Sequence, residues 1–341
     1  MSHSINTIRK IGILVSIFFL FFSLAAPVRA DEANPPGRYS FSLSPLMGML
    51  HGQAEELVFE PIGGDRLLSE LLWDLKPLVY LGLALDFSPR DPFRDSGFIA
   101  AASIKFGFPF RSGTHENRDW LNRQHGLLTH FSQHDVFVLN AILADISAGY
   151  SWRLNDSFAF RAFAEFSFMH FAWSGENGFV QYPPPNEPFP PWHSGLPKRN
   201  LYGMVIRYSQ NWFIFAPGIS LMWRFSPRFS LEGNFSYTPL IICNARDDHL
   251  RNAPPAGTVY WDFMSSGHYI NGGGSFIFSP RDNMDFSLAV SYRHITGTRG
   301  KTYIQENNFG QISRSTLSDA GAGFSALDIS LAARIRLTGH N

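Results

Sequence analysis

Apolar and polar side chains alternate with a period of two along most of this chain. In residues 327–337 the odd-numbered positions are all apolar, and most of the even-numbered positions are polar or charged. The same alternation runs through residues 146–152, 160–168, 229–237 and 285–293. Because successive side chains of a β-strand point to opposite faces, each segment predicts a strand with one apolar and one polar face.

Ten strands are predicted in this way, and they are joined by two kinds of connection. The strands lie at about residues 38–60, 66–86, 96–109, 134–153, 157–173, 204–224, 229–243, 266–279, 284–297 and 320–338. Four connections are tight turns rich in Pro, Asn and Asp: Phe-Ser-Pro-Arg at 87–90, 225–228 and 278–281, and Leu-Asn-Asp-Ser at 154–157. The other connections are longer and polar, at 61–65, 110–133, 174–199, 244–265 and 298–320.

Alternation alone leaves two architectures open. In a soluble sandwich the apolar face packs inward, whereas in an outer-membrane barrel it faces lipid and the polar face lines the lumen. Tight turns alternating with long loops favour an all-β fold, a ten-stranded antiparallel transmembrane β-barrel with long extracellular loops and short periplasmic turns. The first and last strands can then pair and leave no open edge. A barrel this narrow fills with side chains, which argues against a porin.

The N-terminus has the features of a secretory signal peptide. Arg9 and Lys10 precede an apolar run at residues 11–24, and Val28-Arg29-Ala30 is a small-x-small cleavage site. We therefore expect residues 1–30 to be a signal peptide and residues 31–341 to form a single barrel domain. The rival interpretation is an uncleaved anchor.

Composition narrows the class of protein further. Phe occurs 33 times, aromatic residues make up 15% of the chain, and only 16% of the residues are charged. The net charge is zero and no basic tract is present, so nucleic acid is not an expected partner. Cys243 is the single cysteine, which excludes an intramolecular disulfide.

Candidate chemistry collects in the predicted extracellular loops. Asp247 and His249 are an acid and a histidine two residues apart, so the carboxylate can orient the imidazole as a water-activating base. Asn117 and Asp119 lie in the second long loop, and Glu56 lies near the outer end of the first strand. An acid on one wall of a small barrel and an Asp–His pair on the other would aim a water at a peptide carbonyl. The rival interpretation is a solvated, acid-rich loop.

Two further pairs of residues are candidate sites. His130 and His134 are four residues apart, a spacing that brings two side chains together on a helix and not on a strand, so no metal site is predicted. Ser132 and His134 share one face of a strand and are the pair that would suit a lipid-modifying barrel enzyme. No third group to orient this histidine is evident.

Over essentially its whole mature length the chain resembles the omptin family of outer-membrane endopeptidases. The most specific matches are Gly-Gln-Ala-Glu-Glu-Leu-Val-Phe at 52–59 with Gly63 and Gly64, then Ser69 and Trp73, Asp119 and Trp120, Ser-Gln-His at 132–134, and Asp-Asp-His at 247–249. The resemblance implies an endopeptidase that activates water without a covalent intermediate.

The resemblance also implies roles for particular residues. His249 would be the general base, Asp247 its orienting acid, and Asp119 a partner that holds the water, with Asn117 beside it. Glu56 would lie at the floor of the pocket for the basic residue before the cut bond. The expected substrate-binding residues are Glu56, Ser69, Ser132 and His134.

Several positions depart from the family pattern. Asn117 stands where the family has Asp, and an amide carries no negative charge and accepts no proton. A second acid of the basic-residue pocket falls at Ala245. The other departures are Arg246 beside Ala245, His130 in place of an acid, Phe166 and His170 in place of the Tyr and Arg of the lipopolysaccharide-contact motif, and a terminal Asn341 in place of an aromatic residue.

We therefore expect a monomeric endopeptidase of the bacterial outer membrane, with its active site facing the cell exterior, that cuts peptides or proteins near basic residues. No cofactor is predicted. Lipopolysaccharide or another outer-membrane lipid is an expected contact, although the family's contact motif is not retained. Because of Asn117 and Ala245, the alternative is a catalytically weakened barrel that acts as an adhesin or binding protein.

Overall fold

The described part of the protein is a single antiparallel sheet that closes on itself. The computed structural model describes residues 39–61, 64–122, 125–186, 188–251, 257–306 and 310–337. The predicted signal peptide and Gly63 lie outside these residues. No helix among the described residues is long and apolar enough to cross a membrane.

The strands are β1 (Tyr39–Phe59), β2 (Leu67–Pro89), β3 (Gly97–Gly107), β4 (Phe110–Asp119), β5 (His130–Arg153), β6 (Phe158–Gln181), β7 (Arg199–Asn200), β8 (Met204–Ser226), β9 (Phe229–Thr238), β10 (Ile241–His249), β11 (Thr258–Ser265), β12 (His268–Arg281), β13 (Met284–Thr296), β14 (Arg299–Glu306) and β15 (Ser313–Leu337).

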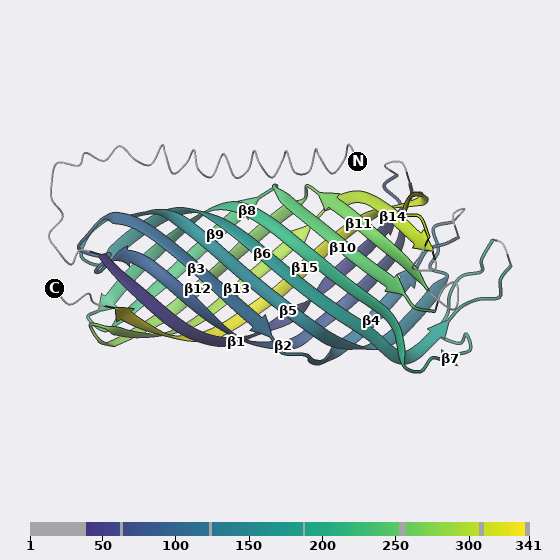
Figure 1. Ribbon diagram of the computed structural model, residues 1–341, viewed down its shortest axis with the longest axis horizontal. Helices are drawn as coiled ribbons and strands as arrows, with labels where there is room; N and C mark the ends of the chain where they lie inside the picture. Colours follow the sequence, from purple (N-terminus) through teal and green to yellow (C-terminus); the bar gives the residue numbers. More distant parts are fainter. Residues whose placement is uncertain are drawn as a thin grey trace. The chain divides into compact units, whose positions relative to one another are not determined.

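These elements make a ring of ten barrel strands, as the sequence predicts (Figure 1). Four barrel strands are each interrupted once, so that β3 continues as β4, β9 as β10, β11 as β12, and β13 as β14. The pairing of β1 with β15, from Phe41↔Leu337 to Phe59↔Asp319, closes the ring. Closure leaves no edge strand in the barrel, which is the condition for a sheet to cross a bilayer.

The strands reach further beyond the membrane than the sequence predicts. The first ten residues of the predicted loop 110–133 form strand β4, and most of the predicted loop 244–265 is the hairpin of β10 and β11. Asn117, Asp119, Asp247 and His249 therefore lie on strands, and their placement in loops was wrong. The reason is that outside the membrane both faces of a strand can be polar, so the alternation that marks a strand disappears.

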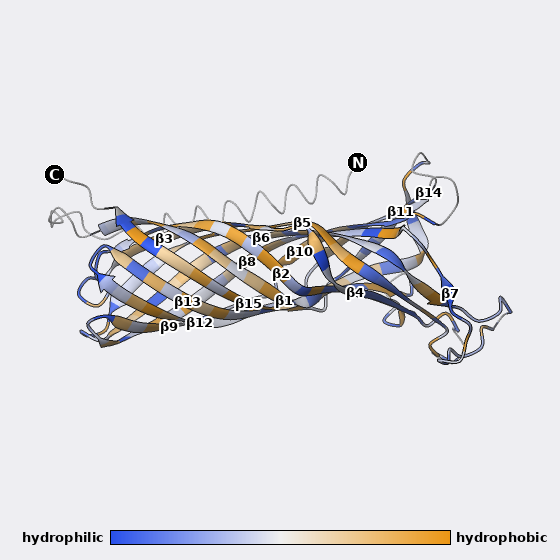
Figure 2. Cartoon of the chain, turned by 90° about the horizontal axis from the view of Figure 1, so that it is seen from below, coloured by the Kyte–Doolittle hydropathy of each residue, from blue (hydrophilic) through white to orange (hydrophobic). Residues whose placement is uncertain are grey.

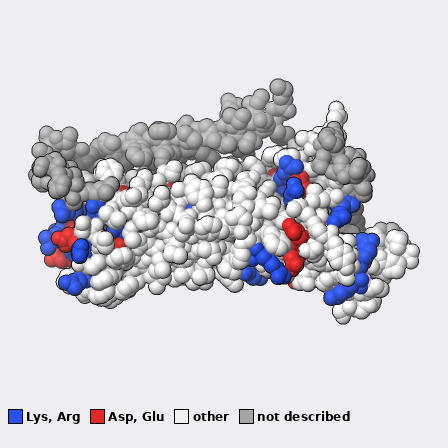
Figure 3. Space-filling view, turned by 60° about the horizontal axis from the view of Figure 1, so that its bottom comes forward, with Lys and Arg blue, Asp and Glu red and all other residues white. Residues whose placement is uncertain are grey.

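An apolar band surrounds the part of the barrel nearer the tight turns. Large outward side chains such as Phe41, Leu85, Ile146, Leu231 and Leu331 are exposed there. On the face shown in Figure 3, Lys, Arg, Asp and Glu gather at the two ends and a broad middle band carries almost none. Figure 2 shows hydrophobic and hydrophilic residues alternating along these strands. This band is the surface that meets lipid.

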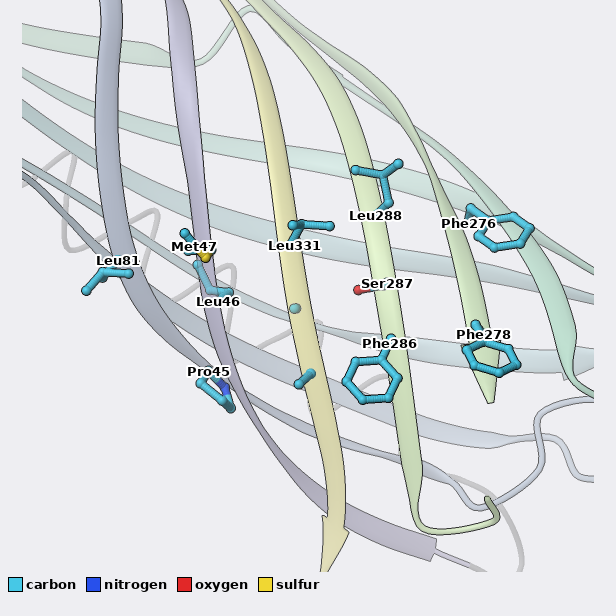
Figure 4. Close-up of a pocket in the computed structure, with 12 residues that line it drawn as sticks. Pro45, Leu46, Met47, Leu81, Phe276, Phe278, Phe286, Ser287, Leu288 and Leu331 are labelled. Atoms are coloured by element: carbon cyan, nitrogen blue, oxygen red, sulfur yellow. The ribbon is translucent and has the colours of Figure 1, made fainter. Parts of the chain in front are cut away.

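The groove in Figure 4 belongs to this lipid-facing surface. It has a volume of about 510 Å³ and lies over β1, β2, β12, β13 and β15. Its lining consists of large apolar side chains such as Met47, Phe286 and Leu331 together with the small residues Ala332 and Ala333. Ser287 is the one lining residue with a polar side chain, and the rest of the lining is apolar, as a lipid-facing surface requires.

The lumen is filled by side chains at two levels. Inside the apolar band, buried ions pair with one another: Arg293 Nη2 lies 3.3 Å from Asp145 Oδ2, and Lys105 Nζ lies 2.8 Å from Asp328 Oδ2. Further out, the lumen is closed by a cluster of buried aromatic rings from Trp73, Phe171, Trp173, Tyr208, Trp212 and Phe324. We call the interior of the barrel beyond this aromatic layer the cup, and the layer itself its floor.

Candidate active site

The floor of the cup is a stack of flat rings. The Trp73 ring centroid lies 5.3 Å from that of Tyr208 and 4.0 Å from that of His115, and all three side chains are buried. Gln210 Nε2 donates a hydrogen bond of 2.8 Å to the backbone carbonyl of Glu55, which ties β8 to β1 across the interior. This rigid layer supports the polar side chains that lie one or two strand positions further out.

The walls of the cup lie outside the lipid-facing band. Arg118 points outward from β4 and forms ion pairs with Glu70 at 3.1 Å and Glu116 at 2.6 Å. On the β10 side, Arg246 Nε lies 2.9 Å from Asp248 Oδ1. Charged pairs on the outer surface are costly in hydrocarbon and ordinary in water. The inward residues at the same level are therefore outside the membrane-spanning segments.

One wall carries the acid–histidine pair. Asp247 and His249 alternate along β10, so both side chains point into the cup, while Asp248 between them points outward. His249 Nε2 lies 2.5 Å from Asp247 Oδ2, and Asp247 is only 2% exposed. The ring of His249 also meets the ring of Tyr260 edge-on at 5.1 Å. The pairing of Asp247 with His249 expected from the sequence is thus present in the structure.

The facing wall carries Asp119 on β4, beside Asn117. The hydroxyl of Ser69, its cross-strand partner on β2, donates a hydrogen bond to Asp119. Asn117 Nδ2 donates a second one to Asp119 Oδ2 at 3.4 Å. Asn117 Oδ1 is buried and has no hydrogen-bond partner among the described residues. Asp119 and His249 interact electrostatically across the cup, so the two walls face one another.

Burial sets the protonation states of Asp119 and His249. It raises the pKa of Asp119 to about 6, although hydrogen bonds from Ser69 and Asn117 and the charge of His249 oppose the shift. Burial also lowers the pKa of His249, against the raising effects of Glu56, Asp119 and Asp248. At neutral pH the histidine is therefore uncharged and Asp119 is mainly ionised. These are the states that a general base and its acidic partner require.

Glu56 approaches the acid–histidine pair from β1. It is 4% exposed, and burial together with the charges of Asp247 and Asp262 raises its pKa. The carboxyl groups of Glu56 and Asp247 lie close enough for each to influence the ionisation of the other. The same surroundings raise the pKa of Asp247.

Asp262 is a site residue that sequence reasoning missed. It lies on β11 and is 5% exposed, and burial raises its pKa to about 6. Its carboxylate accepts a hydrogen bond of 2.7 Å from Thr302 Oγ1 on β14. Asp262 fell inside the predicted loop 244–265, where no register was assigned. The signal that could have found the strand is the run of β-branched and aromatic residues around it, since Val259, Tyr260, Trp261 and Phe263 all favour β-structure.

Ser132 and His134 are buried on β5, two strand positions apart. Ser132 is the cross-strand partner of Asn117 and hydrogen-bonds to Tyr182. His134 lies deeper: its Nδ1 is 2.5 Å from the carbonyl of Asn177, and its ring stacks on His115 at 5.7 Å. His130 packs against Tyr182 and the loop residue Phe189. Within the described ranges, no three His, Cys, Asp or Glu side chains are grouped so as to hold a metal ion.

Comparison with known families identifies the fold. The model of the Omptin family matches residues 37–337. The chain belongs to the omptin family. No curated protein matches it by sequence. Omptins are outer-membrane barrel proteases, and this omptin is accordingly a protein of the bacterial outer membrane.

Among the solved structures, the protease OmpT shares the fold of this omptin. The outer membrane protease OmpT from Escherichia coli is 16% identical with a TM-score of 0.77, and the match covers 90% of this omptin and 99% of OmpT. The transport unit of the autotransporter AIDA-I from Escherichia coli is 11% identical, with a TM-score of 0.35 and coverage of 91% and 93%. The toluene transporter TodX from Pseudomonas putida is 9% identical, with a TM-score of 0.34 and coverage of 88% and 90%.

Proposed function

We propose that this omptin is a cell-surface endopeptidase that hydrolyses peptide bonds near basic residues. One observation carries the proposal. An uncharged histidine paired with a buried acid faces a second acid across a cup that opens outside the membrane. Omptins are proteases, and this arrangement supplies the groups that water-mediated amide hydrolysis requires.

The proposed reaction is a direct attack by water. His249, held by Asp247, accepts a proton as the water oxygen forms a bond to the carbonyl carbon. Asp119 accepts the other hydrogen bond of the water and fixes its orientation. The tetrahedral intermediate then collapses: the carbon–nitrogen bond breaks, and the proton passes from His249 to the leaving amine. The result is a carboxylic acid and an amine, with every group of the enzyme returned to its starting state.

The remaining site residues support this chemistry. Ser69 and Asn117 keep Asp119 ionised through hydrogen bonds. Glu56 lies beside the acid–histidine pair and binds the basic side chain of the substrate. We assign Ser132 to the substrate-facing wall through its pairing with Asn117, and His134 to the layer below it. We propose a monomer whose signal peptide spans residues 1–30 and whose mature part, residues 31–341, is the single barrel domain.

Purified, refolded protein tests the proposal. It should cleave a peptide that contains Arg or Lys, and His249→Ala should lower kcat/KM by at least about 100-fold, the usual contribution of a positioned base. Asp248→Asn is the matched control, because this acid is adjacent in sequence but points away from the cup. Unchanged cleavage by His249→Ala would overturn the assignment.

A second candidate function is a binding barrel with weakened catalysis, such as an adhesin. Asn117 favours it, because Oδ1 of this amide is buried without a partner at a position that faces the acid–histidine pair. The two functions differ in a simple result. An adhesin would show no cleavage of a broad peptide library by the folded wild type, and no difference between the wild type and His249→Ala.

Lipid contact is a separate proposal. Phe166 is exposed on the outer face of β6, and His170 Nδ1 lies 2.8 Å from Asn211 Oδ1 on β8. We propose that lipopolysaccharide or another lipid meets this surface without the family's contact motif. Cleavage measured with and without added lipopolysaccharide tests whether activity depends on it.

A further inference from the structure

Asp262 occupies the position opposite Ala245. The two residues are direct cross-strand partners in the β10–β11 pairing. Side chains of directly opposed residues lie side by side on the same face of a sheet. Because Ala245 has only a methyl group, the space on this part of the wall is left to the Asp262 carboxylate. The hydrogen bond from Thr302, which pairs with Asp262 on its other side, holds that carboxylate in place.

Asp262 joins Glu56 and Asp247 in a group of buried acids without a matching cation. Each of the three carboxylates is within electrostatic range of the other two. In the described part of the chain, no Lys or Arg forms an ion pair with Glu56 or Asp262. Glu56 Oε2 is buried and receives no hydrogen bond from a donor group of the described residues. Buried negative charge of this kind is unfavourable until a cation pairs with it.

An organic cation suits this group of acids better than a metal ion does. No three metal-ligating side chains among the described residues come close enough together to coordinate an ion. Carboxylates spread over β1 and β11 instead suit a flat group with several donors. A guanidinium offers five N–H donors in a fixed plane and can bridge two carboxylates, whereas an ammonium is a single point of charge.

We propose that Asp262 is a specificity-determining residue, which together with Glu56 binds the guanidinium of an arginine in the substrate. This inference rests on the proposed endopeptidase function for its biological meaning. The acid of the pocket is thus supplied by β11, across from the alanine on β10. The arginine side chain brings its own peptide bond to His249, since Asp247 contacts both the acid cluster and the histidine.

A pair of matched peptides tests the role of Asp262. One peptide carries Arg at the cleavage position and the other carries citrulline, which has the same shape without the charge. The ratio of their kcat/KM values should fall by about 10- to 100-fold in Asp262→Asn, the range for one charged hydrogen bond. The double variant Ala245→Asp with Asp262→Ala moves the acid from β11 to the opposite position on β10. It should restore most of the wild-type ratio of kcat/KM for the Arg peptide to that for the citrulline peptide. Asp248→Asn should leave the ratio unchanged.

Direct binding separates this inference from the endopeptidase proposal. Calorimetric titration with argininamide, against citrullinamide as the neutral control, measures the pocket without any cleavage. Binding that is lost in Asp262→Asn supports the pocket even if the wild type cuts nothing. An unchanged Arg-to-citrulline ratio, or unchanged argininamide binding, in folded Asp262→Asn overturns it. If Asp262→Asn does not fold, the same two measurements are made on the double variant Ala245→Asp with Asp262→Ala. An Arg-to-citrulline ratio of kcat/KM near one in that variant would overturn the inference.

Discussion

Asn117 donates a hydrogen bond from Nδ2 to Oδ2 of Asp119, its neighbour but one on β4, at 3.4 Å. The amide thereby helps to keep Asp119 ionised, but it offers no second carboxylate to the cup. Its other atom, Oδ1, is buried without a partner among the described residues. The wall that faces the acid–histidine pair therefore holds one acid and one amide, and this difference can be tested directly.

Asn117→Asp should raise turnover. A second carboxylate can accept a hydrogen bond from the attacking water and stabilise the protonated His249 that forms as the reaction proceeds. We expect kcat to rise by roughly 10-fold, below the usual effect of a complete acid–base group, because Asp119 already holds one side of the water. The measurement is steady-state cleavage of an Arg-containing peptide. Asn117→Ala is the control and should lower kcat. An unchanged kcat in folded Asn117→Asp would favour the binding function.

Activity should rise with pH through about 6, where Asp119 loses its proton. The proposed reaction needs Asp119 ionised and His249 neutral, and both conditions fail as pH falls. Burial lowers the pKa of His249 below its ordinary value, so protonation of this histidine contributes to the same acidic limb. The profile of kcat/KM against pH measures this acidic limb. A profile that falls as pH rises through 6 would contradict the assigned states.

Ser69→Ala should move that limb to higher pH. The hydroxyl of Ser69 stabilises the ionised form of Asp119 and so lowers its pKa. Without the hydroxyl the pKa of Asp119 rises, so a higher pH is needed to reach full activity. A merely structural role for Ser69 would change the height of the profile but not the midpoint of its acidic limb. Ser69→Thr keeps a hydroxyl and should keep the wild-type midpoint.

The fold within the membrane could be predicted because water and lipid impose opposite demands on the two faces of each strand. Along β13, Phe286, Leu288 and Val290 face outward and are exposed, while Asp285 and Arg293 face inward. Outside the membrane this contrast is lost. Along β4, outward Glu116 and Arg118 alternate with inward His115 and Asn117, so polar residues occupy both faces. No period-two signal remains, and the segment resembles a loop.

The site could be predicted only as separate pieces, because the strands that carry it lie outside the membrane and lack the period-two pattern. The acid–histidine pair is local in sequence, since Asp247 and His249 share a face of one strand. The approach of Asp119 from β4 and of Glu56 from β1 depends on closure of the barrel. The contribution of Asp262 depends on one register, in which it is paired with Ala245. Strand register is set by the hydrogen bonds between neighbouring strands. It cannot be assigned to a segment that the sequence predicts to be a loop.

Trp73→Ala should destabilise the barrel and disorder the cup above it. Trp73 is fully buried and stacks on both His115 and Tyr208, so its removal leaves a large cavity at the floor of the site. We expect a loss of about 3–5 kcal/mol in the free energy of unfolding. Urea titration in detergent micelles, followed by tryptophan fluorescence and by gel mobility, gives this quantity. The control is Tyr202→Ala, an aromatic residue that is 74% exposed and should cost less than about 0.5 kcal/mol. Equal losses in the two variants would contradict the packed floor.

Arg293 and Asp145 should stabilise the barrel only as a pair. Arg293 Nη2 lies 3.3 Å from Asp145 Oδ2 in the lumen, and both side chains are largely shielded from water. Arg293→Met leaves the Asp145 carboxylate buried without this partner, which should cost about 3–5 kcal/mol. Adding Asp145→Asn removes the stranded charge, so the double variant should be more stable than Arg293→Met alone. Unfolding free energies of the wild type, both single variants and the double variant complete the cycle and yield the coupling between the two residues. Strictly additive losses would mean that the two ions do not depend on one another, and that the lumen at this level holds enough water to solvate each charge by itself.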